Sequence, residues 1–194
     1  MALLILTMVR TGEGSINSLG AGGLITLEER DTLIAFQDFS FDTDGWDRAI
    51  QENSLPGLGP VLDGSVDTAV ERVFALPEET ALATIRFDMF LNGGWGREDT
   101  IHIILGEIQT LALGWPSDNS ELVTFARDGL SVLAQSALLD PIRDNHRVAR
   151  YSVELAVSFP ADRLTLRLVP ELVDGAQSNW AIDNVSVVAR GPEA

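Results

Sequence analysis

The chain has 194 residues, of which 29 are acidic and 13 basic, and its formal net charge is −16 at pH 7. Such a charge repels phosphate groups, so nucleic acids and anionic membranes are poor partners. The chain contains no cysteine, which excludes disulfides and thiolate metal sites. Its length suits one domain with its own core, and no apolar run approaches the roughly 20 residues that a membrane-spanning helix needs.

The first 23 residues differ from the rest. Residues 3–9 are mostly apolar but lack the basic start and the cleavage site of a secretory signal. Thr11 to Gly23 is rich in glycine and serine, which is typical of a flexible connection. We therefore predict an N-terminal arm and connection over residues 1–23 and a folded domain over residues 24–194. Such an arm can add a strand to the sheet edge of a neighbouring chain.

The stretch from Phe36 to Trp46, FQDFSFDTDGW, alternates aromatic and acidic residues. If Gly45 took the sixth position of an EF-hand loop, Gln51 would take the twelfth, where a bidentate glutamate is required. An EF-hand is therefore excluded. An irregular calcium loop is still open, because calcium accepts carboxylates and backbone carbonyls in other geometries. The carboxylates of this stretch belong to Asp38, Asp42 and Asp44, and Asp47 follows directly after it.

Apolar and polar residues alternate with a period of two over much of the following chain. Rows of apolar residues at every second position lie within 85–91, 101–105, 151–159 and 164–168. This period predicts β-strands with one buried face, and the Gly, Pro, Asn and Asp clusters between them predict turns. Only residues 128–144 indicate a short helix or a long loop. The pattern predicts an all-β fold, an antiparallel β-sandwich of the jelly-roll kind with an extended N-terminal arm.

The last stretch, Ser178 to Arg190, changes its alternation in the middle. Trp180 and Ile182 share one phase, whereas the valines that follow take the other. The change of phase at Asp183 and Asn184 predicts a β-bulge, which re-aims side chains and frees carbonyl groups to hold an ion.

Four short motifs occur in order along the chain: DFSFDTDGW from Asp38, LGPVLDGS from Leu58, LNGGWGRED from Leu91 and SNWAIDNVSVV from Ser178. Together they resemble extracellular jelly-roll modules of bacterial surface proteins, similar to galactose-binding-like carbohydrate-binding domains. The resemblance covers about residues 33–188. It implies a non-catalytic jelly roll, often with a structural calcium between the first and last strands. On that pattern the candidate ligands are Asp38, Asp183 and, from the acidic loop, Glu98.

Three tryptophans in turn-like stretches are candidate sugar-binding residues: Trp95, Trp46 and Trp115. Sugar rings stack on exposed aromatic faces, whereas tryptophan is more often buried at the end of a strand. Trp95 is flanked by glycines and is the first candidate for an exposed platform. Trp180 is a candidate core residue from its place in the alternation.

The sequence shows no catalytic constellation. His102 and His146 do not adjoin a serine elbow, and no G-x-S-x-G motif or phosphate-binding glycine loop occurs. We therefore expect a protein that is not an enzyme, with a hydrolase or lyase as the third alternative.

Two other functions rank before the enzyme alternative, and both stay open. The first is a calcium-stabilised module that binds a polysaccharide or cell-surface glycan. The second is a structural subunit of a spike, a fibre or a capsid-attached assembly on a phage-like or gene-transfer-agent-like particle. In the second case the chain forms a homo-oligomer whose arm binds neighbouring chains. Both functions predict a location on an extracellular surface or a virion-like particle.

Overall fold

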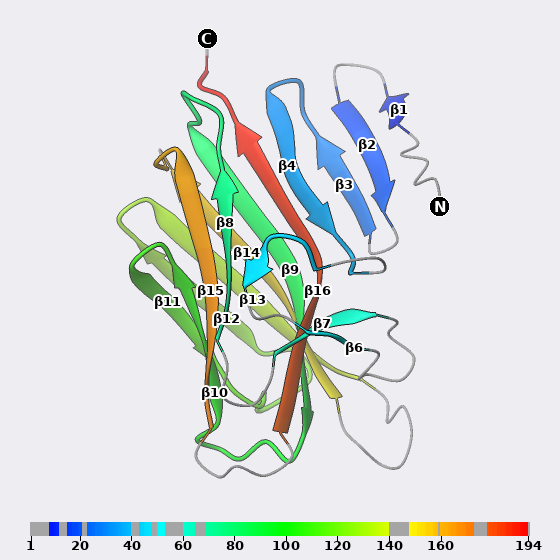
Figure 1. Cartoon of the computed structure of the whole chain (residues 1–194), viewed down its shortest axis with the longest axis vertical. Coiled ribbons are helices and arrows are strands. Elements are labelled where there is room, and N and C mark those ends of the chain that lie inside the picture. The colour runs from blue at the N-terminus through cyan, green and yellow to red at the C-terminus, as the bar shows by residue number, and fades with distance from the viewer. Residues whose placement is uncertain are drawn as a thin grey trace.

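The computed structural model describes residues 8–11, 15–20, 23–39, 43–47, 50–52, 60–64, 69–139, 148–158, 160–172 and 178–193. These residues form sixteen β-strands and no helix (Figure 1). The all-β prediction is therefore confirmed. The described part of the chain holds no helix that is long and apolar enough to cross a membrane.

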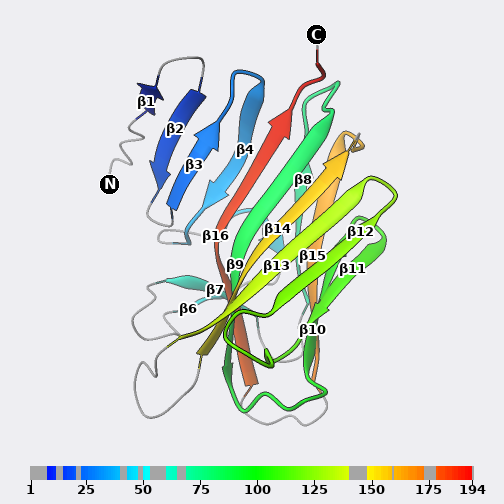
Figure 2. The same cartoon turned by 180° about the vertical axis from the view of Figure 1, so that it is seen from behind.

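Two antiparallel sheets form a β-sandwich-like body. The larger, eight-stranded sheet runs β12-β13-β14-β9-β16-β7-β6, and β4 also pairs with β16. Its strands are β4 (Asp31–Gln37), β6 (Ile50–Glu52), β7 (Val61–Gly64), β9 (Leu82–Gly93), β12 (Leu122–Arg127), β13 (Leu130–Leu139), β14 (Val148–Ser158) and β16 (Ser178–Arg190). The smaller, five-stranded sheet runs β11-β10-β15-β8-β5. Its strands are β5 (Trp46–Asp47), β8 (Val70–Ala75), β10 (Thr100–Leu105), β11 (Ile108–Leu113) and β15 (Arg163–Glu171). Figure 1 looks onto the smaller sheet, and Figure 2 looks onto the outer face of the larger one.

The core lies between the two sheets and is built from every second residue of their strands. Ile85, Leu155 and Trp180 of the larger sheet are fully buried. They belong to one cluster with Ile103 and Leu166 of the smaller sheet. The four predicted apolar rows coincide with β9, β10, β14 and β15, so the period of two identified these strands correctly.

The prediction of a helix or loop over residues 128–144 is wrong where the structure describes this stretch. Leu130–Leu139 forms β13, which pairs with β12 on one side and β14 on the other. Its residues alternate between core and solvent, but the inward positions include Ala134 and Ser136. Such small side chains weaken the apolar period from which a strand is identified.

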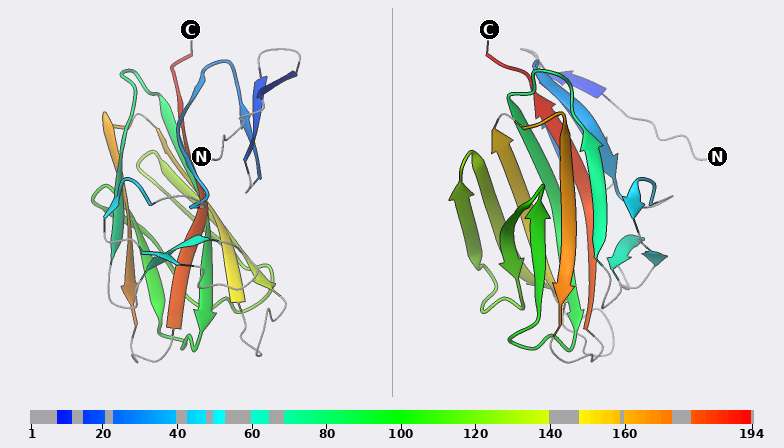
Figure 3. Two further views of the ribbon diagram at one scale, coloured as in Figure 1. Left: turned by 45° about the vertical axis from the view of Figure 1, so that its right-hand side comes forward. Right: turned by 60° about the vertical axis from the view of Figure 1, so that its left-hand side comes forward.

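The N-terminal strands form a third sheet of their own. β1 (Met8–Thr11), β2 (Ser15–Gly20) and β3 (Gly23–Leu27) pair antiparallel in chain order. The segment predicted as a flexible connection thus contains a strand, because pairing on both edges of β2 outweighs its glycine and serine content. The third sheet lies beside β4 (Figure 3), and Leu27 packs against Val188 of β16. Residues 1–7 lie outside the described residues, and the domain boundary at residue 24 stays a prediction.

Candidate functional site

The predicted bulge is present in β16. Asp183 lies opposite Asp88 of β9 and Ser186 lies opposite Arg86, so two residues of β16 face a single residue of β9 between these pairs. Asn184 has a φ of 56°, a left-handed conformation that asparagine adopts more readily than most side chains. The extra residue restores the phase, and four apolar side chains of β16 therefore face the same core: Trp180, Ile182, Val185 and Val187.

Next to the bulge, the charges of Asp38 and Asp88 act on the carboxyl group of Asp183. Asp183 faces Asp88 on the outer face of the larger sheet, and Asp38 directly follows β4, which pairs with the other edge of β16. Burial raises the pKa of Asp183 to about 6, and the negative charges of Asp38 and Asp88 add to this rise. The structure therefore brings together two of the predicted metal ligands, Asp38 and Asp183, and adds Asp88 beside them.

Asp88 and Asp183 are held in place by hydrogen bonds. Asp88 accepts one from Ser152 Oγ at 2.9 Å and one from Asn184 Nδ2 at 3.1 Å. Nε of Arg150 lies 3.9 Å from Asp88 Oδ1. Asp183 Oδ1 accepts a bond of 2.7 Å from the backbone N–H of Asn184. An ionised carboxylate offers about four acceptor positions, so acceptor positions for a cation are left on both side chains.

The third predicted ligand, Glu98, does not join these aspartates. It is exposed in the loop between β9 and β10, and Trp95 ties this loop to Asn179 by a hydrogen bond of 3.1 Å. Asp183 lies four positions after Asn179 along β16, a rise of about 13 Å. The described residues contain no group of three or more acidic or histidine side chains arranged to hold a metal ion. A calcium ion here would therefore need carbonyl groups or water beside Asp38 and Asp183.

Among the candidate tryptophans, Trp46 belongs to the core. It is 8% exposed, and its ring centroid lies 6.1 Å from that of Phe39. Its Nε1 donates to Gln37 Oε1 at 2.9 Å, and the guanidinium of Arg72 lies 5.9 Å from its ring centroid. This position leaves little of the Trp46 ring for a sugar.

Trp95 and Trp115 lie at one end of the body, in the loops β9–β10 and β11–β12. Both are half-buried and pack against the core. The Nε1 of Trp95 donates to the carbonyl oxygens of Asn92 and Asn179, each at 3.1 Å. Because its N–H is used internally, Trp95 offers a ligand its ring surface rather than a hydrogen bond.

These two loops are packed against each other. Asp99 is 4% exposed and accepts a bond of 2.6 Å from the N–H of Gly96. A Cβ added to Gly114 would lie 2.9 Å from the carbonyl oxygen of Asp99, a contact that only glycine permits. Tyr151 donates from its hydroxyl to the Gly114 carbonyl at 3.0 Å. The loops therefore present Trp95 and Trp115 in a fixed arrangement.

Asp88, Asp99 and Tyr151 are not among the candidate residues predicted from the sequence. Asp88 occupies an outward position of the row 85–91, where a surface aspartate is ordinary, and its partners come from β14 and β16. Asp99 and Tyr151 carry no signal, because their contacts depend on how the two end loops pack.

No family model, curated protein or solved structure matches the chain. The likeness to galactose-binding-like modules therefore stays a prediction that rests on the sequence motifs.

Proposed function

We propose that the chain is a non-catalytic polysaccharide-binding module with jelly-roll topology, located on a cell surface or a virion-like particle. The observation that carries this proposal is the placement of Trp95 and Trp115, both half-buried, on neighbouring loops at one end of the body. Aromatic rings that are fixed before binding lose little conformational entropy when a ligand stacks on them.

Calcium is the second element of this proposal. Burial raises the pKa of Asp183, and the repulsion of two neighbouring carboxylates adds to this rise. A bound cation relieves that repulsion. Asp38 and Asp183 would supply carboxylate oxygens to the ion. Asp38 belongs to the segment after β4, and Asp183 belongs to β16, which pairs with β4. The ion would therefore connect these two parts of the larger sheet.

A glycan array probed with the labelled full-length chain tests the proposal. We expect binding to a defined set of glycans and its loss in Trp95→Ala and Trp115→Ala. Val73→Ala is the matched control, because Val73 is an apolar residue of the smaller sheet that is 50% exposed. Binding that survives both tryptophan substitutions would move the site away from the end loops, and no binding to any glycan would remove the function.

The N-terminal sheet favours a second function, that of a structural subunit in a spike, fibre or capsid-attached assembly. Strands β1–β3 form a sheet separate from the two sheets of the body. A small sheet with open edges can pair with a neighbouring chain by strand addition. Analytical ultracentrifugation separates this function from the first. A homo-oligomer that becomes monomeric on deletion of residues 1–23 supports it, and a full-length chain that is monomeric at every concentration contradicts it.

A further inference from the structure

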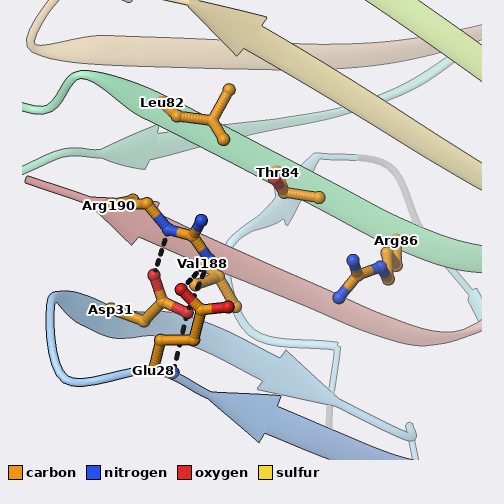
Figure 4. Close-up of a pocket in the computed structure, with 7 residues that line it drawn as sticks. All are labelled: Glu28, Asp31, Leu82, Thr84, Arg86, Val188 and Arg190. Carbon is orange, nitrogen blue, oxygen red and sulfur yellow. Dashed lines mark hydrogen bonds and ion pairs between the residues drawn. The ribbon is translucent and has the colours of Figure 1, made fainter.

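A pocket of about 330 Å³ opens on the outer face of the larger sheet (Figure 4). Thr84 and Leu82 of β9 and Val188 of β16 line it, and Val188 lies directly opposite Thr84 in the strand register. Glu28, in the turn that follows β3, stands beside it. Leu82 and Thr84 begin β9 whereas Trp95 follows its end, so this pocket and the tryptophan loops lie at opposite ends of one strand.

Arg190 stands at one end of the pocket and is held there by two acids. Its Nε and Nη2 donate to the two carboxylate oxygens of Asp31 at 2.7 and 3.2 Å, and its Nη2 lies 3.2 Å from Glu28 Oε2. The side chain of Asp31 is 3% exposed, and it also accepts a bond from the Glu28 N–H at 2.9 Å. Nη1 of Arg190 has no hydrogen-bond partner among the described residues, and one nitrogen of its guanidinium lies on the side away from both acids (Figure 4).

Arg86 stands at the other end of the pocket. Its Nε donates to Glu154 Oε2 at 2.7 Å, and neither of its Nη groups has a partner in the described part of the chain. The guanidinium extends along the sheet toward Val188, and Thr84 lies between the two arginines (Figure 4). The pocket thus presents unused N–H donors from both ends and a hydroxyl between them.

These donors restrict the charge of a ligand. Each arginine is already paired with an acid, so three carboxylates (Glu28, Asp31 and Glu154) face two guanidiniums, Arg86 and Arg190. The chain as a whole carries −16. A net-negative surrounding disfavours an anionic ligand, and unused N–H donors disfavour a cation. The pocket therefore suits an uncharged ligand that is rich in oxygen acceptors.

The size of the pocket and the apolar residues on its floor restrict the class of ligand further. Val188 and Leu82 supply apolar surface between the polar ends. The volume is at the lower end of the range of about 300–1,000 Å³ for ligand pockets. A sugar unit combines hydroxyl and ring oxygens with apolar C–H faces, and a single unit matches a pocket of this size.

We propose that this pocket is a second carbohydrate subsite that selects an uncharged sugar unit, to which Arg86, Thr84 and Arg190 donate hydrogen bonds. The inference rests on the proposed polysaccharide-binding function and extends it to a second site and to neutral glycans. A polymer that reaches both the pocket and the tryptophan loops binds with an affinity greater than that of either site.

Affinity electrophoresis of the full-length chain tests this inference, in gels that contain dextran, galactomannan or arabinoxylan, with polygalacturonate as the acidic polymer. Thr84→Val removes the hydroxyl and keeps the branched shape. Arg86→Gln removes the guanidinium. Thr124→Val on β12 is the matched control for the first. Arg167→Gln is the control for the second, because Arg86 and Arg167 are paired with glutamates and are 51% and 49% exposed.

We expect at least one neutral polymer to retard the wild-type chain and polygalacturonate not to. Loss of one hydrogen bond then raises the Kd about fivefold in Thr84→Val, and loss of the charged donors raises it about tenfold in Arg86→Gln. Both controls bind as the wild type does. If Arg86→Gln lowers the unfolding temperature, Arg86→Lys takes its place, since it keeps the charge but loses the forked donors.

The outcomes separate the two proposals. A wild-type chain that no polymer retards contradicts the polysaccharide-binding function and the subsite with it. Wild-type binding that is lost in Trp95→Ala but unchanged in both pocket variants overturns the subsite alone. Stronger binding to polygalacturonate than to the neutral polymers overturns the assignment of an uncharged ligand.

Discussion

Asp183 and Asp88 face each other across β16 and β9, and Asn184 forms the bulge beside them. Like charges at directly opposed positions destabilise a sheet. Asn184 reduces this repulsion, since its backbone N–H bonds Asp183 and its side chain bonds Asp88. The burial of Asp183 and the remaining repulsion make Asp183 sensitive to pH and to cations.

The first prediction concerns pH. The folded protein raises the pKa of Asp183 from 3.8 to about 6, so it binds this proton more tightly than the unfolded chain does. The contribution of Asp183 to stability is therefore most favourable below about pH 4 and is lost as the pH rises through 6. Relative to Asp183→Asn, we expect the wild type to lose roughly 1–2 kcal/mol of unfolding free energy, a value reduced for the partial exposure of Asp183.

Urea unfolding of the wild type and of Asp183→Asn at pH 4 and pH 7.5 measures this loss. The asparagine keeps an oxygen acceptor for the N–H of Asn184, so the local fold is preserved. A difference in unfolding free energy that stays constant between the two pH values would show that Asp183 titrates as an ordinary surface aspartate.

The second prediction concerns calcium at pH 7.5. We expect Ca²⁺ to raise the unfolding temperature and a chelator to reverse this, because the ion binds the folded state alone. At a concentration of 100 times the Kd, the gain in unfolding free energy is about 2.7 kcal/mol. Asp183→Asn should lose most of this gain, and Mg²⁺ should give little of it because it keeps its water shell. Identical melting curves with calcium and with chelator would remove the metal from the account.

The third prediction isolates the backbone of the bulge. Asn184→Ala and Asn184→Gly both delete the hydrogen bond to Asp88, so they differ mainly in how well they tolerate the φ of 56°. We expect the alanine variant to be less stable than the glycine variant by about 1 kcal/mol in chemical denaturation. Equal stability of the two would mean that the left-handed conformation at residue 184 carries no strain.

The fourth prediction tests the packing of the two end loops. A Cβ on Gly114 meets the Asp99 carbonyl at 2.9 Å, whereas a Cβ on Gly191 meets no atom within 4 Å. Gly114→Ala should therefore cost about 1–3 kcal/mol of stability through overpacking and should weaken glycan binding, because it displaces the loop that carries Trp115. Gly191→Ala is the control and should change neither. Unaltered glycan binding by a folded Gly114→Ala variant would show that this loop is not part of the site.

The sequence predicted those structural features that depend on residues close together in the chain. The period of two located β9, β10, β14 and β15, and the change of phase located the bulge at Asp183 and Asn184. The alternation of apolar and polar residues did not identify β13, because small and polar residues occupy some of its inward positions. The amino-acid composition did not identify β2, because its glycine and serine content is typical of a flexible connection, whereas the segment forms a strand that pairs on both edges.

The sequence predicted only some of the residues of the candidate sites. Asp38 and Asp183 could be paired through their motifs, but Glu98 could not be placed because loop positions are not set by strand alternation. The pocket was not predicted. It depends on the contact between Asp31 and Arg190, which are 159 residues apart, and on the register that sets Val188 opposite Thr84.

Iodide quenching of tryptophan fluorescence, during titration of the full-length chain with neutral polysaccharides, tests polysaccharide binding most directly. Trp46 and Trp180 are buried, so the quenchable emission comes mainly from Trp95 and Trp115. We expect a saturable fall in quenching with at least one neutral polymer, and a weaker response in Trp95→Phe. If quenching stays unchanged with every polymer, the chain does not bind polysaccharide through these tryptophans.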